Sequence, residues 1–90
     1  MADSDIHEKL YDASGGYDGN DTRVRELLEA GADPNKYNSG GWTALIRAAF
    51  QGRDSTASIL IQHGADLDIQ NNEGKKPIQV ARNVEIARLE

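Results

Sequence analysis

Cysteine is absent from the 90-residue sequence, and tryptophan, phenylalanine and methionine each occur once. Without cysteine the chain can form neither a disulfide framework nor a thiolate zinc site, and nothing indicates an oxidising compartment. No apolar run approaches the length that spans a bilayer, and the acidic first residues are unlike a secretion signal. We therefore expect an intracellular protein, cytoplasmic or nuclear, with no membrane partner.

An excess of basic charge is also lacking, since 15 acidic and 10 basic residues give a formal net charge of -5. Binding to nucleic acid needs a concentrated basic patch that neutralises phosphates, whereas the arginines and lysines here are dispersed. We therefore expect no nucleic-acid partner. A composition of 38% hydrophobic and 28% charged residues indicates one small folded domain rather than a disordered chain.

Catalytic and metal-binding constellations are missing as well. Neither His7 nor His63 has a convergent acidic or nucleophilic partner, so we expect no enzymatic activity and no cofactor. His63 is interpreted as a residue at a helix end, facing the helix dipole. Asp18 and Asn20 superficially match a calcium loop, but the central glycine of such a loop is absent, so we interpret them as a solvated loop and expect no metal.

A repeat with a period of 33 residues organises the chain. The matching glycines and aliphatic residues are Gly31 and Gly64, Gly41 and Gly74, and Leu45 and Ile78. A fixed period of this length is typical of stacked-repeat proteins, in which each unit buries its apolar face against its neighbours. Helices as short as those expected here are unstable alone, so the repeats must stabilise one another.

Apolar spacing predicts a series of short helices separated by polar turns. They are expected at residues 6–14, from Asp21 or Thr22 to Gly31, from Thr43 to Gly52 and at residues 55–63, with a last pair from Pro77 to Glu90. Residues 1–5 are expected to be frayed. Two polar, turn-rich segments, residues 32–41 and 65–74, lie between the helix pairs, and we call them the first and second fingers. The predicted inward-facing residues are Ile6, Leu10, Ala13, Val24, Leu27, Leu28, Leu45, Ile46, Ala48, Ala49, Thr56, Ile59 and Leu60.

Residues 43–49 (TALIRAA) resemble the T-P-L-H-x-A-A run of the ankyrin repeat. Residues 31–35 (GADPN) are similar to the phrase that closes such a repeat, and residues 64–68 match it except for Asp68 in place of asparagine. Residues 74–81 form a weaker third copy. The histidine of the motif is replaced in every copy, by Tyr11, Ile46 and Gln79, so the threonine–histidine hydrogen bond usual in the family is absent.

The resemblance implies an all-α ankyrin solenoid of antiparallel helix pairs linked by β-turn fingers. The resemblance covers nearly the whole chain, from about Ile6 to the end, and we expect residues 1–90 to form a single domain of about two and a half to three repeats. We place repeat 1 at about residues 6–37, repeat 2 at 38–70 and a shortened repeat 3 at 71–90. Repeat 1 carries an inserted loop at residues 15–21.

By the same resemblance, the chain is expected to bind a segment of another protein on its concave face. The family's variable contact positions fall on Tyr37, Ser39, Trp42, Arg47, Phe50, Gln51, Asn72, Glu73 and Lys75. The only tryptophan and the only phenylalanine both belong to this set. Aromatic residues and arginine dominate the binding energy of protein interfaces, so Trp42, Arg47 and Tyr37 are the expected anchors.

Several alternatives stay open at this point. Trp42 either contacts a partner or lies flat over the first finger, and Phe50 either contacts a partner or fills the corner between helix pairs. Tyr17 either belongs to the binding surface or folds back onto the first helix pair. Asn35 resembles the repeat asparagine that an oxygen-dependent hydroxylase modifies, but an asparagine at this place also stitches the finger through backbone hydrogen bonds.

A second function is a structural or assembly role, as a fragment of a longer ankyrin array. In that case Ile86 and Leu89, at an uncapped C-terminal end, pair with another copy or with a following repeat. A pure recognition module is expected to be a monomer instead.

Overall fold

The computed structural model describes residues 2–15 and 21–81, with side chains from residue 6 onward. These residues form five helices and no β-strand. The helices are α1 (Ala2–Ser14), α2 (Asp21–Glu29), α3 (Ala44–Gln51), α4 (Asp54–Gln62) and α5 (Pro77–Val80).

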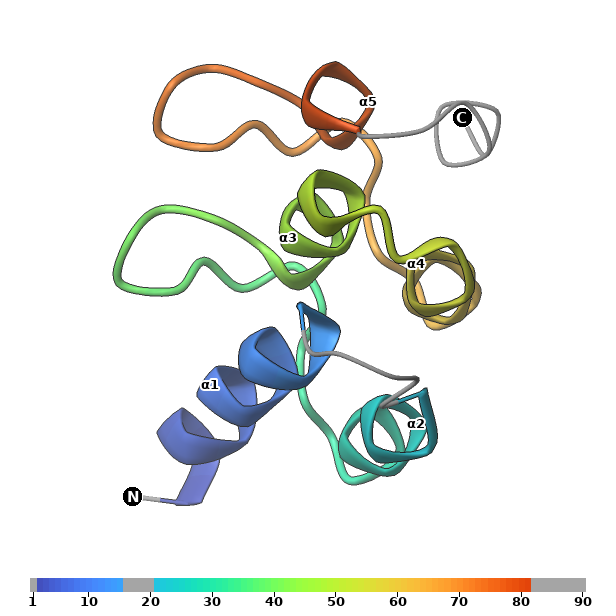
Figure 1. Cartoon of the computed structure of the whole chain (residues 1–90). Coiled ribbons are helices and arrows are strands. Elements are labelled where there is room, and N and C mark those ends of the chain that lie inside the picture. The colour runs from blue at the N-terminus through green and yellow to red at the C-terminus, as the bar shows by residue number, and fades with distance from the viewer. Residues whose placement is uncertain (1, 16–20, 82–90) are drawn as a thin grey trace.

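The helices stack in two columns (Figure 1). An inner column contains α1, α3 and α5, and an outer column contains α2 and α4, with contacts both within and between the columns. Both fingers project from the inner column to the same side, away from the outer helices. This arrangement confirms the all-α solenoid expected from the sequence.

One continuous core runs through the stack. Every side chain predicted to face inward in α2, α3 and α4 is buried. In α1, Leu10 is buried while Ile6 and Ala13 are half-buried and pack against the same core. Because the core is shared between successive repeats, each short helix is stabilised mainly by its neighbours.

Glycine ends the outer helices in the same way in both repeats. Gly31 and Gly64 have φ values of +106° and +94°, a left-handed conformation that other residues rarely adopt. After Gly31 the backbone N–H of Ala32 donates to the carbonyl of Leu27 at 3.0 Å, and the equivalent bond of the next repeat spans 2.9 Å. This is the Schellman ending, and its recurrence explains the 33-residue spacing of the glycines.

The limits of α3 were also predicted correctly. The Thr43 hydroxyl accepts the backbone N–H of Ile46 at 3.3 Å and thereby caps the helix. Gly52, with φ of +72°, ends it. Pro77 lies in the first turn of α5, where its missing N–H is not needed.

Several predicted boundaries were wrong. Residues 2–5 belong to α1 rather than to a frayed start. Both predicted caps of α2, Asp21 and Thr22, lie inside the helix. The fourth helix begins at Asp54, one residue early. Tyr17, most of the inserted loop, the second helix of the last pair, Ile86 and Leu89 lie outside the described residues.

Each finger is closed by the side chain of an asparagine. Asn38 Oδ1 accepts the backbone N–H groups of Gly40 and Trp42 at 3.0 Å each. Asn71 Oδ1 makes the equivalent pair of bonds in the second finger, at 2.8 and 3.0 Å. One side chain thus fixes the turn at each finger tip.

The side chain of Asn35 joins the two repeats. Its Nδ2 donates to the carbonyl of Gly64 at 3.0 Å, and its Oδ1 accepts the backbone N–H of Asp66 at 2.6 Å. One repeat earlier, the equivalent N–H of Asp33 donates to His7 Nδ1 at 3.0 Å. These bonds support the structural interpretation of Asn35, while its hydroxylation stays a prediction.

The outer helices are joined by Asp21. Its carboxylate oxygens accept hydrogen bonds from the hydroxyls of Ser55 and Thr56, both at 2.6 Å. Burial raises the pKa of this carboxyl, but the bonds from Ser55 and Thr56 and the charge of Arg25 outweigh it, so the pKa lies below its ordinary value. The charged form of Asp21 is therefore favoured by folding.

This linkage predicts how Asp21→Asn changes stability with pH. A carboxyl with a lowered folded-state pKa stabilises the fold above its unfolded pKa of about 3.9, and the contribution disappears as the pH falls through the folded pKa. We expect the variant to be less stable by about 1–2 kcal/mol at pH 7, with the gap closing below about pH 4. Urea unfolding of both proteins across this range measures the gap, with Glu29→Gln as the control, and a gap independent of pH contradicts the assignment.

A second prediction concerns the contact between repeats. Asn35→Ala removes both hydrogen bonds, one to the Gly64 carbonyl and one from the Asp66 N–H, and should lower the free energy of unfolding by about 1–3 kcal/mol. Asn72→Ala, at an exposed side chain of the second finger, serves as the control and should change it by less than about 0.5 kcal/mol. Equal effects in thermal unfolding would show that Asn35 does not join the repeats.

Candidate functional site

Trp42 and Phe50 form the centre of an open hollow on the finger side of α3. Their rings meet edge to face, with centroids 5.3 Å apart and planes at 90°. Tyr11, Arg47 and Gln51 complete the lining of this hollow of about 340 Å³, which we call the aromatic hollow. The structure thus brings together four of the predicted contact residues and adds Tyr11 from α1.

The exposure of these rings bears on the alternatives left open by the sequence. Phe50 is 42% exposed and therefore does not fill a corner of the core. Trp42 is half-buried and its ring packs against Phe50, so part of its side chain remains accessible. Among the described residues, Phe50 and Tyr37 are the large apolar side chains with the greatest exposure, and Tyr37 is 51% exposed.

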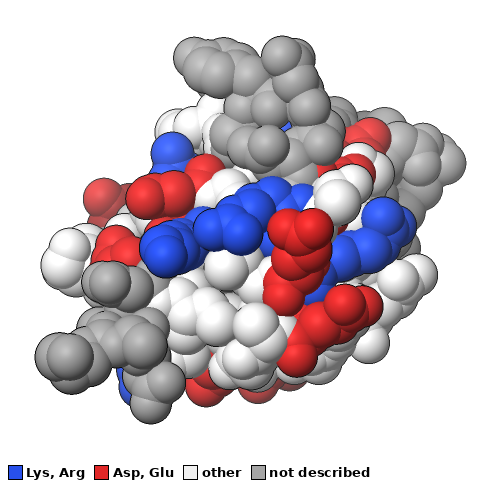
Figure 2. Space-filling view, turned by 90° about the horizontal axis from the view of Figure 1, so that it is seen from below, with Lys and Arg blue, Asp and Glu red and all other residues white. Residues whose placement is uncertain are grey.

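Opposite charges are intermingled on the face at the α1 and α2 end. Figure 2 shows a band of lysine and arginine side chains with acidic side chains directly beside it. One such pair on α2, Arg23 with Glu26, is separated by 3.8 Å, and both side chains are more than half exposed, so the pair contributes little stability. This face therefore carries no patch of a single charge sign.

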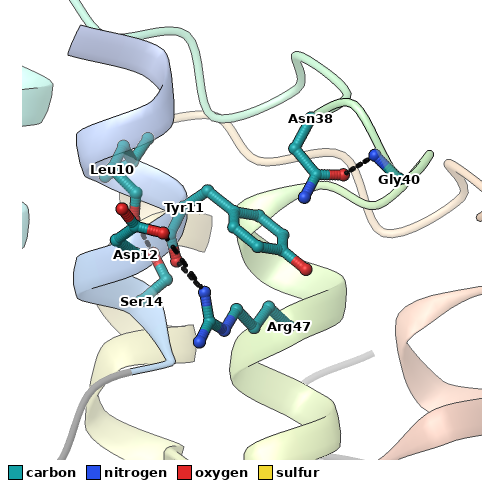
Figure 3. Close-up of polar contacts among 7 residues, drawn as sticks. All are labelled: Leu10, Tyr11, Asp12, Ser14, Asn38, Gly40 and Arg47. Atoms are coloured by element: carbon teal, nitrogen blue, oxygen red, sulfur yellow. Dashed lines mark hydrogen bonds and ion pairs between the residues drawn. The ribbon is translucent and has the colours of Figure 1, made fainter. Parts of the chain in front are cut away.

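Arg47 reaches from α3 to α1 (Figure 3). Its guanidinium carbon lies 4.7 Å from the centre of the Tyr11 ring, a cation–π contact. Its Nη1 donates to the Tyr11 carbonyl at 3.3 Å and lies 3.6 Å from Asp12 Oδ1. A Cβ on Gly15 would lie 1.9 Å from Arg47 Nε, so the glycine leaves space for the guanidinium. The predicted anchor is thus held in place by the first repeat.

Tyr11 is the lining residue that the sequence analysis missed. Tyr11 is 36 residues from Arg47 in the sequence, so no local pattern links the two. Because it directly follows the buried Leu10, the apolar spacing of α1 indicates only that Tyr11 lies near the surface. Its role becomes visible only when α1 and α3 are stacked side by side. Its place in the motif gave no such signal, because the corresponding Ile46 of the next repeat is buried in the core.

A second hollow, of about 310 Å³, lies between the fingers. Tyr37 and Ser39 from the first finger and Asn72 from the second line it with three neighbours; we call it the finger hollow. The Tyr37 hydroxyl donates to the Gln70 carbonyl at 2.5 Å, which ties the finger tips together. Asn71 is 5% exposed, and its Nδ2 is buried without a hydrogen-bond partner in the described part of the chain.

The two remaining predicted contact residues, Glu73 and Lys75, are exposed on and just after the second finger and line neither hollow. The predicted set therefore extends from the aromatic hollow across the fingers. Its role in binding stays a prediction.

The histidines have structural partners. His63 Nδ1 lies 3.0 Å from the Ile59 carbonyl at the end of α4, where the sequence placed it beside a helix end. His7 accepts a backbone N–H, as described above. Within residues 2–15 and 21–81, no three potential metal-ligating side chains gather at one point. In the same segments, no helix has both the length and the apolar character that crossing a bilayer requires.

Comparison with known proteins identifies the repeat. A family model described as ankyrin repeats, three copies, matches residues 10–89. Ankyrin repeat domain-containing protein 40 of Mus musculus is 36% identical over 67 residues, 73% of this chain and 18% of that protein. An ankyrin repeat-containing protein of Schizosaccharomyces pombe is 31% identical over 70 residues, 78% of this chain and 34% of that protein.

The match extends to larger proteins of other activities. The 2-5A-dependent ribonuclease of Mus musculus is 39% identical over 64 residues, which are 70% of this chain but 9% of that protein. The chain spans about a third or less of the length of these three relatives. Ankyrin repeats are generally modules for binding other proteins and are typically not catalytic. With the motif present in three copies over most of its length, the chain belongs to the ankyrin-repeat family.

Proposed function

We propose that the chain is a non-catalytic, monomeric interaction module that holds a segment of a partner protein on its finger side. The observation that carries the proposal is the aromatic hollow, in which an exposed Phe50 stands edge to face against a half-buried Trp42. The proposed contact surface comprises Tyr37, Ser39, Trp42, Arg47, Phe50, Gln51, Asn72, Glu73 and Lys75. Trp42, Arg47 and Tyr37 are its proposed anchors.

The energy available at this surface is sufficient for specific binding only if several contacts act together. Covering the exposed 42% of Phe50 removes roughly 80 Å² of apolar surface from water, worth about 2 kcal/mol. Association itself costs several kcal/mol, so further contacts are needed from Trp42 and from Tyr37 across the fingers. The fixed geometry of Tyr37 and Arg47 lowers this cost, because Tyr37 is already hydrogen-bonded to the Gln70 carbonyl and Arg47 is already stacked on Tyr11.

The proposal predicts the effect of truncating the two rings. Trp42→Ala and Phe50→Ala should each weaken binding to the partner by more than about 1–2 kcal/mol, roughly tenfold, while the helix content is unchanged. The partner is captured from lysate with the wild-type chain, and its affinity for each variant is then measured by titration calorimetry. Circular dichroism verifies folding.

Glu29→Ala is the matched control, because this exposed residue lies on α2 in the outer column. It should leave the affinity unchanged. A partner that binds all four proteins with the same affinity contradicts the proposed surface, and sedimentation of the wild-type chain as a dimer contradicts the proposed monomer.

A further inference from the structure

The aromatic hollow has a single charged member. Of its five lining residues, Tyr11, Trp42 and Phe50 are aromatic, Gln51 is neutral, and only Arg47 carries charge. A hollow bounded by three rings resembles a site for an ammonium group, but a fixed guanidinium repels a cation. The lining therefore favours an apolar group accompanied by a negative one.

Arg47 is positioned to bind a negatively charged group. Its side chain is 27% exposed, so its charge is less screened than that of a fully exposed arginine. The hydrogen bond to the Tyr11 carbonyl and the ion pair with Asp12 both use Nη1, whereas a guanidinium carries five N–H donors on three nitrogens. A carboxylate can take two parallel hydrogen bonds from a guanidinium, and stacking on Tyr11 has already fixed the plane of this one.

Asp12, the acidic neighbour of Arg47, forms only a weak ion pair with it. Asp12 is 76% exposed and approaches one nitrogen at 3.6 Å, the geometry of a weak surface pair. A partner carboxylate that is covered by the bound segment interacts more strongly, because water is excluded around it. Asp12 can turn toward solvent when this happens.

The charge of the whole chain limits the partner further. A net charge of -5 repels an acidic run at long range, whereas one carboxylate among neutral or basic residues gains the local contact without this cost. Together, Arg47 and the net negative charge of the chain favour a partner segment with one isolated acidic residue over a segment with a run of acidic residues.

We propose that the aromatic hollow receives a large apolar side chain of an extended partner segment, and that a single aspartate or glutamate beside it binds Arg47. This inference rests on the proposed function and names the chemistry of the partner. It makes Arg47 a determinant of specificity, while Trp42 and Phe50 provide most of the binding energy.

The test uses a phage-displayed library of random short peptides selected on the whole chain. Selected peptides should share a large apolar residue with Asp or Glu next to it. Replacing that acid by its amide should weaken binding to the wild-type chain about tenfold in fluorescence polarisation. Arg47→Gln should bind the acid and amide peptides equally, whereas the matched control Arg23→Gln, with the same charge change on α2, should keep the tenfold preference.

Gly15→Ala supplies a second variant in case Arg47→Gln does not fold. The added Cβ would lie 1.9 Å from Arg47 Nε, too close to be tolerated, and should displace the guanidinium without changing the charge of the chain. It should also reduce the preference for the acid peptide, and an unchanged preference contradicts the inference.

The outcomes separate the inference from the proposed function. Peptides that need Trp42 and Phe50 but show no preference for an acid overturn the inference and leave the proposed function intact. Selection of lysine or of basic peptides at this position also overturns it, and so does a preference that persists in Arg47→Gln. A library that yields no peptide dependent on Trp42 and Phe50 contradicts both.

Discussion

Packing of each repeat against the next is the constraint on which the whole structure depends. The helices α2, α3 and α4 contain 9, 8 and 9 residues, fewer than an isolated helix needs in water. Their apolar faces meet in one core, and side chains such as Asn35 and Asp21 add hydrogen bonds between successive repeats. The proposed binding surface is a consequence of this stacking, since no single repeat contains it.

The aromatic hollow shows this dependence most clearly. Its walls come from α1, from the end of the first finger and from α3, and Arg47 is held across the boundary by the Tyr11 ring and carbonyl. The same contacts that stabilise the stack therefore set the orientation of a charged group at the surface. Preorganisation of this kind lowers the entropy lost on binding and makes recognition more selective.

The sequence predicted the features that depend on local chemistry and on the 33-residue period. Gly31 and Thr43 were identified as helix limits because left-handed backbone and capping hydroxyls have strong residue preferences. The Tyr11–Arg47 contact could not be predicted, because it depends on how neighbouring repeats are rotated and displaced. The caps of α2 were placed too late since acidic residues are favourable both before a helix and in its first turn.

The central claim is that the partner lies against the finger side of the inner column. Site-specific photo-crosslinking in cells tests it most directly, with a photoreactive phenylalanine analogue placed at Phe50 or, for comparison, at Glu29 on α2. The account predicts a covalent adduct with another protein from position 50 and none from position 29. An adduct from position 29 alone would place the partner on the outer column and contradict the account.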